Sequence, residues 1–457
     1  MFKFKKYVLC FTVSALSIFL YGCGIEDDEE GYGYYQYVNL VPQSPNIEFV
    51  VESSSLGDLA FTEATAYKYV SKGTFDIEFN QILPNIENES FIDDESLRVY
   101  ANKLHSYILY GEASSPSNYT IEIDVSDVYS DDFDDEYAMV QFVNLANSGE
   151  SVDVYLLDAD DNLINQSVDY SLGQADTSGD VEVSEGDYKI VFTESGSDSI
   201  LAQKNNISID EGEALSYILV SYYVAGYDEA RYKIVELNDT GSRSLTNQAA
   251  DAHLRVANGI SNTSGISIAT GESSNILESY LELGSISSDV AISISISDSD
   301  SAESTTVFIV DSEDETQLDS TSLSLYADDQ ILLLTAGDAN AAVSLNESNE
   351  DLRVIDTHGK ILLSHAIYAE RDETLEVLII EEGSNPDSYD TELSVSYLDT
   401  GSYEIEAGNY DIYIYDSNDE LLLEFTLYDL AEGDVVNLVT TDFETSGSPY
   451  QIAEYFN

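Results

Sequence analysis

The chain has 457 residues, and its 88 Asp and Glu outnumber its 16 Lys and Arg to leave a net charge of −72. A surface of that sign repels nucleic acid and anionic lipid headgroups, and we exclude nucleic acid as a partner. The chain is nevertheless not a disordered acidic tail, because 43% of its residues are hydrophobic and it contains 34 Tyr and 16 Phe. Its length exceeds what one hydrophobic core supports and therefore predicts several domains.

The first 22 residues have the layout of a secretory signal peptide. Three lysines precede an apolar stretch from Tyr7 to about Tyr21, which is too short to span a membrane comfortably. The sequence LYGC at 20–23 resembles the lipobox of bacterial lipoproteins. That resemblance implies cleavage before Cys23 and a lipid on its sulfur, so that the lipid anchors the protein to a membrane. The alternative is an uncleaved signal anchor.

Cysteine usage supports this reading of the N-terminus. Cys10 would leave with the signal, so the mature chain would have neither a free thiol nor a disulfide, which excludes a thiolate nucleophile and a cysteine zinc site. Gly24 follows Cys23 where an Asp would favour inner-membrane retention, so the lipoprotein resemblance implies the outer membrane. The sequence leaves open whether the protein is surface-exposed or faces the periplasm. Residues 23–34 are short, acidic and glycine-containing, and we expect an acidic flexible tether.

Alternation of apolar and polar residues dominates the rest of the chain. Segments such as DVAISISISDS and NYDIYIYDS are typical of strands with one buried face, and Gly, Asn, Asp and Ser mark the turns between them. Residues 97–110 come nearest to a helical period, but we expect their second half to be a strand. The predicted fold class is therefore all-β.

Self-comparison finds four copies of one unit. Residues 302–335 and 407–440 align without a gap, a third copy starts at Glu185, and a weaker first copy starts at Lys72. A unit has about 100–110 residues with a turn every 8–12, which is the size and rhythm of an immunoglobulin-like antiparallel β-sandwich. We therefore predict tandem sandwiches of this kind, joined by short linkers into a rod.

The predicted organisation divides the chain at its acidic and Ser- or Asn-rich linkers. It comprises a lipoprotein signal peptide (1–22), the tether (23–34), and β-sandwich repeats one to four at 35–130, 138–240, 252–356 and 360–457.

Two unit openings carry a family signature. YVNLVPQSPNIEFVV at 37–51 and QFVNLANSGESVDVYLLD at 141–158 each join a strand ending in Val-Asn to a turn and a second strand. They resemble the start of the domain of unknown function 4397 family, and a Gly-x-Tyr strand and a YILV strand follow in the family order. The third opening keeps Val256 and Asn258, whereas the fourth has lost the asparagine. The resemblance implies a sandwich-type repeat of cell-envelope lipoproteins, and it assigns no catalytic residue.

Candidate catalytic chemistry is scarce. The four histidines, His105, His253, His358 and His365, are spread over three units. His358 and His365 with Asp356 form a conceivable metal pair, but zinc sites usually take three or four ligands, so we expect a turn histidine and a strand histidine instead. The sequence contains no G-x-S-x-G elbow, P-loop or H-E-x-x-H motif. We therefore expect neither an enzyme nor a cofactor.

Calcium is the one ion that the acidic composition suggests. Residues 158–163 and 416–421 begin like an EF-hand loop, but leucine stands where that loop needs its glycine, so we predict hairpin turns. The linker between the first two units is different, because its crowded carboxylates would repel one another unless a cation neutralised them; the alternative is a solvated linker. The candidate calcium ligands are Asp131, Asp132, Asp134 and Asp135.

These observations predict a non-catalytic outer-membrane lipoprotein. Its expected role is adhesion, matrix contact or binding of a protein or polysaccharide partner through exposed edge strands and loops. An alternative is a periplasm-facing structural or accessory lipoprotein. A third, a carbohydrate-binding or hydrolytic protein, is disfavoured because Trp is absent and each unit is too small for a deep cleft.

Overall fold

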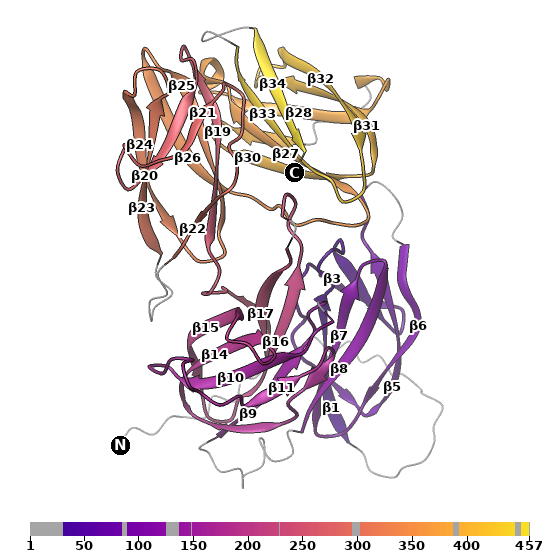
Figure 1. Cartoon of the computed structure of the whole chain (residues 1–457). Coiled ribbons are helices and arrows are strands. Elements are labelled where there is room, and N and C mark those ends of the chain that lie inside the picture. The colour runs from indigo at the N-terminus through magenta and orange to yellow at the C-terminus, as the bar shows by residue number, and fades with distance from the viewer. Residues whose placement is uncertain are drawn as a thin grey trace, which may run out of the picture.

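The computed structural model describes residues 31–84, 89–124, 137–147, 149–227, 229–294, 302–386, 393–443 and 449–456. Within them, regular structure is almost entirely β-strand, with one short 3-10 turn, η1 (Tyr368–Glu370). The described strands form eight sheets, two to a unit (Figure 1). The prediction of tandem all-β sandwich domains is confirmed. No helix in this described part of the chain has the length and hydropathy needed to cross a membrane.

Unit 1 packs a sheet of order β4-β1-β7-β8 on a sheet of order β3-β2-β5-β6. Its strands are β1 (Tyr32–Leu40), β2 (Ile47–Val51), β3 (Ser54–Leu59), β4 (Lys68–Ser71), β5 (Gly73–Gln81), β6 (Glu89–Val99), β7 (Lys103–Glu112) and β8 (Ser115–Asp124).

Unit 2 packs a sheet of order β12-β9-β16-β17-β18, in which β13 also pairs with β9, on a sheet of order β11-β10-β14-β15. Its strands are β9 (Tyr137–Asn144), β10 (Val152–Asp158), β11 (Tyr170–Leu172), β12 (Asp176–Thr177), β13 (Val181–Ser184), β14 (Gly186–Glu194), β15 (Ile200–Ile209), β16 (Ala214–Tyr222), β17 (Arg231–Asn238) and β18 (Gly241–Leu245).

Unit 3 packs a sheet of order β22-β19-β25-β26 on a sheet of order β21-β20-β23-β24. Its strands are β19 (Ala252–Ser261), β20 (Ile266–Thr270), β21 (Ile276–Leu281), β22 (Val290–Ile292), β23 (Glu303–Asp311), β24 (Gln317–Leu325), β25 (Gln330–Asp338) and β26 (Ala342–Asn349).

Unit 4 repeats that pattern, with sheets of order β30-β27-β33-β34 and β29-β28-β31-β32. Its strands are β27 (Gly359–Ala366), β28 (Thr374–Glu381), β29 (Leu393–Ser396), β30 (Thr400–Ile405), β31 (Gly408–Tyr415), β32 (Leu421–Leu430), β33 (Val435–Asp442) and β34 (Tyr450–Phe456).

Each unit contains one parallel pair of strands at the centre of one sheet. These pairs are β1–β7, β9–β16, β19–β25 and β27–β33, and the other ladders between described strands are antiparallel. The pairs are buried on both faces: every residue of β27 and β33 is buried, as are all but the first of β16. Strands covered on both faces are rich in apolar residues without strict alternation, as in QILLLTAGD of β25 and VVNLVTTD of β33.

The second face of each parallel pair packs against another unit. Val38 and Ile108 of unit 1 share a buried apolar cluster with Val143 and Ile218 of unit 2. The inward-facing neighbours of these residues on the same strands, such as Leu109, belong to the core of their own unit. The two central sheets therefore form one continuous apolar layer between units 1 and 2.

Units 3 and 4 meet in the same way. Leu332 and Leu334 of β25 share a buried cluster with Ala366 of β27 and Val439 of β33. At Gly259 of β19 the backbones approach so closely that an added Cβ would lie 2.7 Å from the Ala366 Cβ and 2.5 Å from the Thr335 carbonyl oxygen. Only glycine fits such an approach without moving one unit relative to the other.

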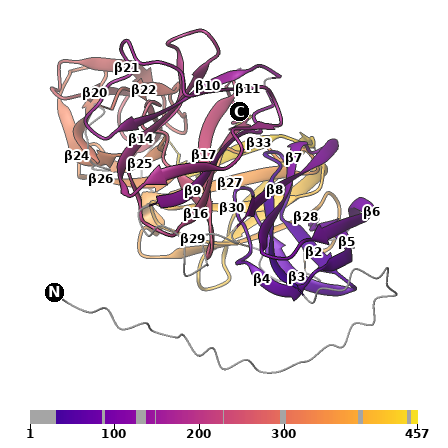
Figure 2. The ribbon, with the colours of Figure 1, turned by 90° about the horizontal axis from the view of Figure 1, so that it is seen from below.

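The predicted rod is therefore wrong. Units 1 and 2 lie side by side at one end of the molecule, and units 3 and 4 lie side by side at the other (Figures 1 and 2). A rod would leave the outer faces of the parallel pairs in water, and each square ångström of apolar area so exposed costs about 25 cal/mol.

Two boundaries also differ from the prediction. β1 begins at Tyr32, inside the segment 23–34 that was expected to be a flexible tether, and β18 (Gly241–Leu245) occupies a predicted linker. Tyr32 and the residues after it pair with β4 and β7, while β18 pairs with β17. The start of β1 and the strand β18 both belong to central sheets that lie against a neighbouring unit.

The packing of units 1 and 2 predicts the cost of truncating the outer face of β7. Ile108→Ala is expected to lower the free energy of unfolding by about 2–4 kcal/mol, because it leaves a cavity in a buried interface. Urea unfolding followed by tyrosine fluorescence measures the change. In the control Ile276→Ala, at a side chain that is 44% exposed, the change is expected to stay within about 0.5 kcal/mol. An equally small effect at Ile108 would mean that units 1 and 2 are not packed together in solution.

Candidate functional site

The segment between β26 and β27, residues 350–358, is a strap that lies against three units. The amide of Ala225 in unit 2 donates to the carbonyl of Leu352 at 2.8 Å. The amide of Asp356 donates to the carbonyl of Gln43 in unit 1 at 2.9 Å, and the Gln43 side chain donates back to the Asp356 carboxylate at 2.8 Å. The strap thus joins segments that are more than 300 residues apart in sequence.

Arg353 fixes the strap to unit 1. Its Nη1 donates to the carbonyls of Pro42 at 2.9 Å and Ser44 at 2.8 Å, both in the buried turn after β1. Its guanidinium also lies 5.8 Å from the centre of the Phe61 ring. The side chain therefore satisfies two carbonyls that the turn leaves without a partner in a ladder.

Lys360 fixes the strap to unit 4. This lysine is buried at the start of β27, and its Nζ donates to the Asp351 carboxylate at 2.7 Å and to the Arg353 carbonyl at 3.1 Å. Burial lowers the pKa of Lys360. Burial alone would raise the pKa of Asp351, but the Lys360 ammonium holds it below its usual range. The ion pair therefore joins a buried ammonium to a carboxylate whose side chain is 58% exposed at the surface of the strap.

Asp328, in the turn between β24 and β25, joins unit 3 to unit 2. The Tyr222 hydroxyl lies 3.1 Å from both of its carboxylate oxygens, Arg231 Nη1 lies 3.4 Å from Oδ1, and Lys233 Nζ lies 3.9 Å from Oδ2. Burial raises the pKa of Asp328, and Lys233, Arg231 and the Tyr222 hydroxyl oppose that rise. A second buried pair stands nearby, since Arg255 Nε and Nη2 reach the Glu350 carboxylate at 2.9 and 2.5 Å.

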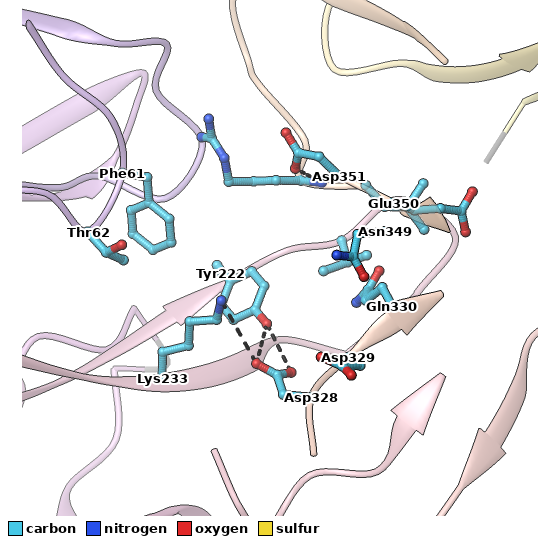
Figure 3. A pocket seen from close by; sticks show the side chains of 13 residues that line it. Phe61, Thr62, Tyr222, Lys233, Asp328, Asp329, Gln330, Asn349, Glu350 and Asp351 are labelled. Carbon is cyan, nitrogen blue, oxygen red and sulfur yellow. Dashed lines mark hydrogen bonds and ion pairs between the residues drawn. The ribbon is translucent and has the colours of Figure 1, made fainter. Parts of the chain in front are cut away.

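A cavity of about 350 Å³ lies between these pairs (Figure 3). Its wall is polar, and the Gln330 Oε1 atom is buried there without a hydrogen-bond partner among the described residues. The cavity is lined by Phe61, Thr62, Tyr222, Val224, Lys233, Asp328, Asp329, Gln330, Asn349, Glu350, Asp351, Leu352 and Arg353. Its size suits several waters or a small polar solute. Most of its charged side chains, however, already form ion pairs or hydrogen bonds that hold the units together.

A second cavity, of about 380 Å³, lies on the other side of Asp328. Tyr227, Arg231 and His253 contribute to its wall, with Leu201 and Ala249 among its apolar residues. The His253 Nδ1 lies 2.7 Å from the Asp289 carboxylate and 3.2 Å from the Tyr227 hydroxyl, and Arg231 stacks 4.5 Å over the Tyr227 ring. These contacts hold the side chains in place and extend the charged seam between units 2 and 3.

The predicted turn and strand histidines are where the sequence placed them. His358 precedes β27 and bonds to Glu404 at 3.1 Å, while His365 lies near the far end of β27. Seven residues of extended strand separate the two by roughly 23 Å, so the conceivable metal pair with Asp356 is wrong. Within the described ranges, no group of three His, Cys, Asp or Glu side chains is arranged to hold a metal ion. His105 is buried in unit 1, where its Nε2 accepts from the Tyr100 amide at 2.9 Å.

The asparagine of the family signature is a buried structural residue. In units 1, 2 and 3 its Oδ1 accepts the amide two residues further on, at 3.1, 3.1 and 2.9 Å, and its Nδ2 donates to a leucine carbonyl on the neighbouring β-hairpin. The three residues are Asn39, Asn144 and Asn258. This side chain ties the end of the first strand to the opposite sheet, and it is not aimed at a cavity.

His365 takes the asparagine's place in unit 4. Its Nδ1 accepts the Ile367 amide at 3.3 Å, as Asn258 accepts the amide of Ile260, but its Nε2 is buried without a partner among the described residues. Burial lowers its pKa to about 4. The asparagine lost from the fourth opening and the strand histidine His365 are therefore one and the same position.

The hairpin prediction is confirmed for residues 416–421, whereas residues 158–163 form a turn that opens the longer loop between β10 and β11. Asp416 accepts the amides of Asn418 and Glu420 at 2.9 and 2.7 Å in the turn between β31 and β32, and these bonds lower its pKa. Asp311, at the matching position of unit 3, accepts the Glu313 amide at 2.8 Å. Cys23 and the four linker aspartates, Asp131, Asp132, Asp134 and Asp135, lie outside the described residues, so lipidation and calcium binding stay predictions.

The strap and its ion pairs were missed by sequence reasoning. The available signal was the scarcity of cations, since only 13 Lys and Arg follow Cys23 and six of them fall between residues 231 and 360. Arg243 pairs with Glu236 inside unit 2, and the other five are Arg231, Lys233, Arg255, Arg353 and Lys360.

Comparison with known proteins agrees with the family resemblance. The sequence model of the family described as "Domain of unknown function (DUF4397)" matches residues 33–155, which confirms the resemblance for unit 1 and the opening of unit 2. No curated protein matches the chain. Among solved structures, the chain is similar to the Bacillus anthracis TIE protein, with 9% identity over 90% of this chain and 68% of that one and a TM-score of 0.15.

Removal of the Arg353 side chain tests the strap. Arg353→Ala is expected to lower the free energy of unfolding by about 2–3 kcal/mol, because two buried carbonyls lose a charged donor. It should also make residues 350–358 a site of proteolytic cleavage in the native protein. Arg371→Ala, which removes an exposed arginine bonded only locally to Tyr368, is the matched control. Equal stability and equal protease resistance of the two variants would contradict the role of the strap.

The depressed pKa of His365 makes unit 4 sensitive to acid. The folded state holds this ring neutral down to about pH 4, whereas the ring of the unfolded chain titrates near 6.5. The stability that it contributes is therefore present above about pH 6.5 and is lost as the pH falls to 4, in total roughly 3 kcal/mol.

His365→Asn, which restores the residue of the other units, is expected to remove that part of the acid destabilisation. Urea unfolding at pH 7 and at pH 4 gives the loss of unfolding free energy between the two pH values, and this loss is compared between the variant and wild type. His253→Asn, at a ring bonded to Asp289, serves as the control. An unchanged pH dependence in His365→Asn would show that this ring is not kept neutral by the fold.

Proposed function

We propose that this protein is a non-catalytic lipoprotein of the bacterial cell envelope that displays one preassembled body of four sandwiches to a partner. The observation that carries the proposal is the joining of all four units. Apolar layers join units 1 and 2 and units 3 and 4, and the strap joins the two pairs. A body of this kind suits presentation or spacing of surfaces rather than closure around a substrate.

The position of the strap argues for the same role. Catalytic sites usually carry polar groups that are poised for substrate and left without internal partners. At the junction of the units, the acids instead form ion pairs with cations. The pairs are Asp328 with Arg231, Glu350 with Arg255, and Asp351 with Lys360. The surfaces left for a partner are the outer edge strands and the loops.

The direction of β1 supports an anchor at the N-terminus. The end of β1 leads into the turn at Pro42 and Ser44 that the strap contacts, so its start lies about 30 Å away, at the end of unit 1 remote from units 3 and 4 (Figure 1). A lipid on Cys23, nine residues before Tyr32, would therefore hold unit 1 nearest the membrane. Units 3 and 4 would stand farthest from it and meet the partner, whether a protein or a polysaccharide.

Replacement of Cys23 tests the anchor. Cys23→Ala is expected to abolish incorporation of labelled palmitate and to move the protein from the detergent phase to the aqueous phase in detergent phase separation. Cys10→Ala is the matched control, because Cys10 would leave with the signal and its loss should change neither readout. Unchanged detergent partitioning of Cys23→Ala would contradict a lipid anchor at this residue.

Protease treatment of intact cells, with immunodetection of unit 4 and a periplasmic protein as control, tests the side of the outer membrane. Loss of unit 4 while the control survives supports binding of an external partner. Survival of unit 4 until the outer membrane is opened would support the alternative, an accessory lipoprotein that faces the periplasm.

A further inference from the structure

The start of β1 gathers exposed tyrosines and cations at one end of unit 1. The Lys72 amide donates to the Gly31 carbonyl at 2.9 Å, and the Asn102 amide donates to the Tyr32 carbonyl at 2.9 Å, so the β4–β5 and β6–β7 turns both adjoin this point. We call this region the basal surface. Its members are Tyr32, Tyr69, Tyr100, Lys72, Arg98 and Lys103.

The tyrosines of the basal surface are unusually open to solvent. Tyr32, Tyr69 and Tyr100 are 48%, 59% and 40% exposed. Tyr32 and Tyr69 stack with ring centres 4.8 Å apart on the outer face of the sheet, and Tyr34 adjoins Tyr69 at 5.1 Å. Tyr34 is packed against the apolar layer shared with unit 2. The stacked pair of Tyr32 and Tyr69 therefore lies just beyond the edge of that layer, where unit 2 no longer covers the sheet.

The cations of the basal surface stand out in so acidic a protein. Arg98 lies 4.9 Å over the Tyr100 ring and Lys103 lies 5.8 Å from it. Lys103 is paired with Glu122 at 3.0 Å, but the described residues offer neither Lys72 nor Arg98 a carboxylate partner. Two cations therefore remain free to meet an anionic ligand beside three open phenol rings.

We propose that the basal surface is a membrane-contact surface, with its tyrosine rings at the level of the lipid headgroups and Lys72 and Arg98 on lipid phosphates. Tyrosine combines an apolar ring with a polar tip and is enriched at membrane–water interfaces for that reason. Arginine and lysine beside it add attraction to phosphate. The inference rests on the proposed anchor for its biological setting, since Cys23 precedes Tyr32 by nine residues.

The reach and the charge of the chain are compatible with this contact. The eight residues between Cys23 and Tyr32 span at most about 28 Å, so an anchored unit 1 stays close to the bilayer. The carboxylates of units 2 to 4 do not prevent the approach, because at physiological salt their field is screened within about 8 Å. The five acids at 26–30 directly precede this surface and oppose its approach to anionic lipid, so the tyrosine rings and the contacts of Lys72 and Arg98 with phosphate must outweigh that repulsion.

Vesicle sedimentation of the unlipidated chain from Gly24 onward tests the proposal independently of the anchor. The probes are vesicles of phosphatidylethanolamine with phosphatidylglycerol, at physiological salt. Binding is expected in wild type and should weaken roughly 25-fold in Lys72→Gln/Arg98→Gln, since each cation near such a surface contributes about fivefold. Tyr32→Ser/Tyr69→Ser should weaken it as well. All four positions are at least partly exposed, so the melting temperature should change little.

Matched controls replace similar residues elsewhere. Lys189→Gln/Arg371→Gln removes the same charge, and Tyr280→Ser/Tyr428→Ser removes two tyrosines that are 56% and 55% exposed. Neither control should change binding. No vesicle binding by wild type, or equal loss in the controls, would overturn the proposal even if Cys23 proves to be lipidated. Retention on peptidoglycan or another envelope polysaccharide without vesicle binding, lost in Tyr32→Ser/Tyr69→Ser, would overturn it in favour of a sugar-stacking surface.

Discussion

The structure depends on the burial of a parallel strand pair on both of its faces. Within one unit, the inward residues of such a pair, for example Tyr217 and Leu219 of β16, pack against the opposite sheet. The outward residues between them, such as Ile218, have no cover of their own and require a second unit. A single unit would therefore expose a broad apolar face, and the tandem arrangement is what makes each sandwich stable in water.

Scarce positive charge is concentrated where the acidic units must meet. With a net charge of −72, four acidic sandwiches repel one another unless their contacts are apolar or locally neutralised. Arg353 and Lys360 hold the strap, and Arg231 with Lys233 faces Asp328 at the boundary of units 2 and 3. Each of these cations is at least half buried, so the bonds resist the screening that weakens exposed ion pairs in salt.

The sequence was sufficient for the strands and the repeat, but not for the arrangement of the units. Alternation in NYDIYIYDS predicts the β31 strand correctly, because that strand buries one face only. The three consecutive apolar residues ILL of β27 carried the opposite information, burial on both faces, and a rod would leave one of those faces without a packing partner. Long-range contacts such as Arg353 with Pro42 leave no local pattern at all, since 311 residues separate them. Likewise, the role of His365 became visible only from its superposable bonds with Asn258.

Small-angle X-ray scattering of the chain from Gly24 onward tests the joined body most directly. A compact protein of about 430 residues has a radius of gyration of about 22–25 Å. Four sandwiches of roughly 33 Å placed end to end would give about 38 Å. A value near 25 Å is the result that face-to-face packing of the units predicts. A value near 38 Å, with the elongated profile of a rod, would contradict the packing of the units on one another. It would mean that each unit is an independent domain in solution.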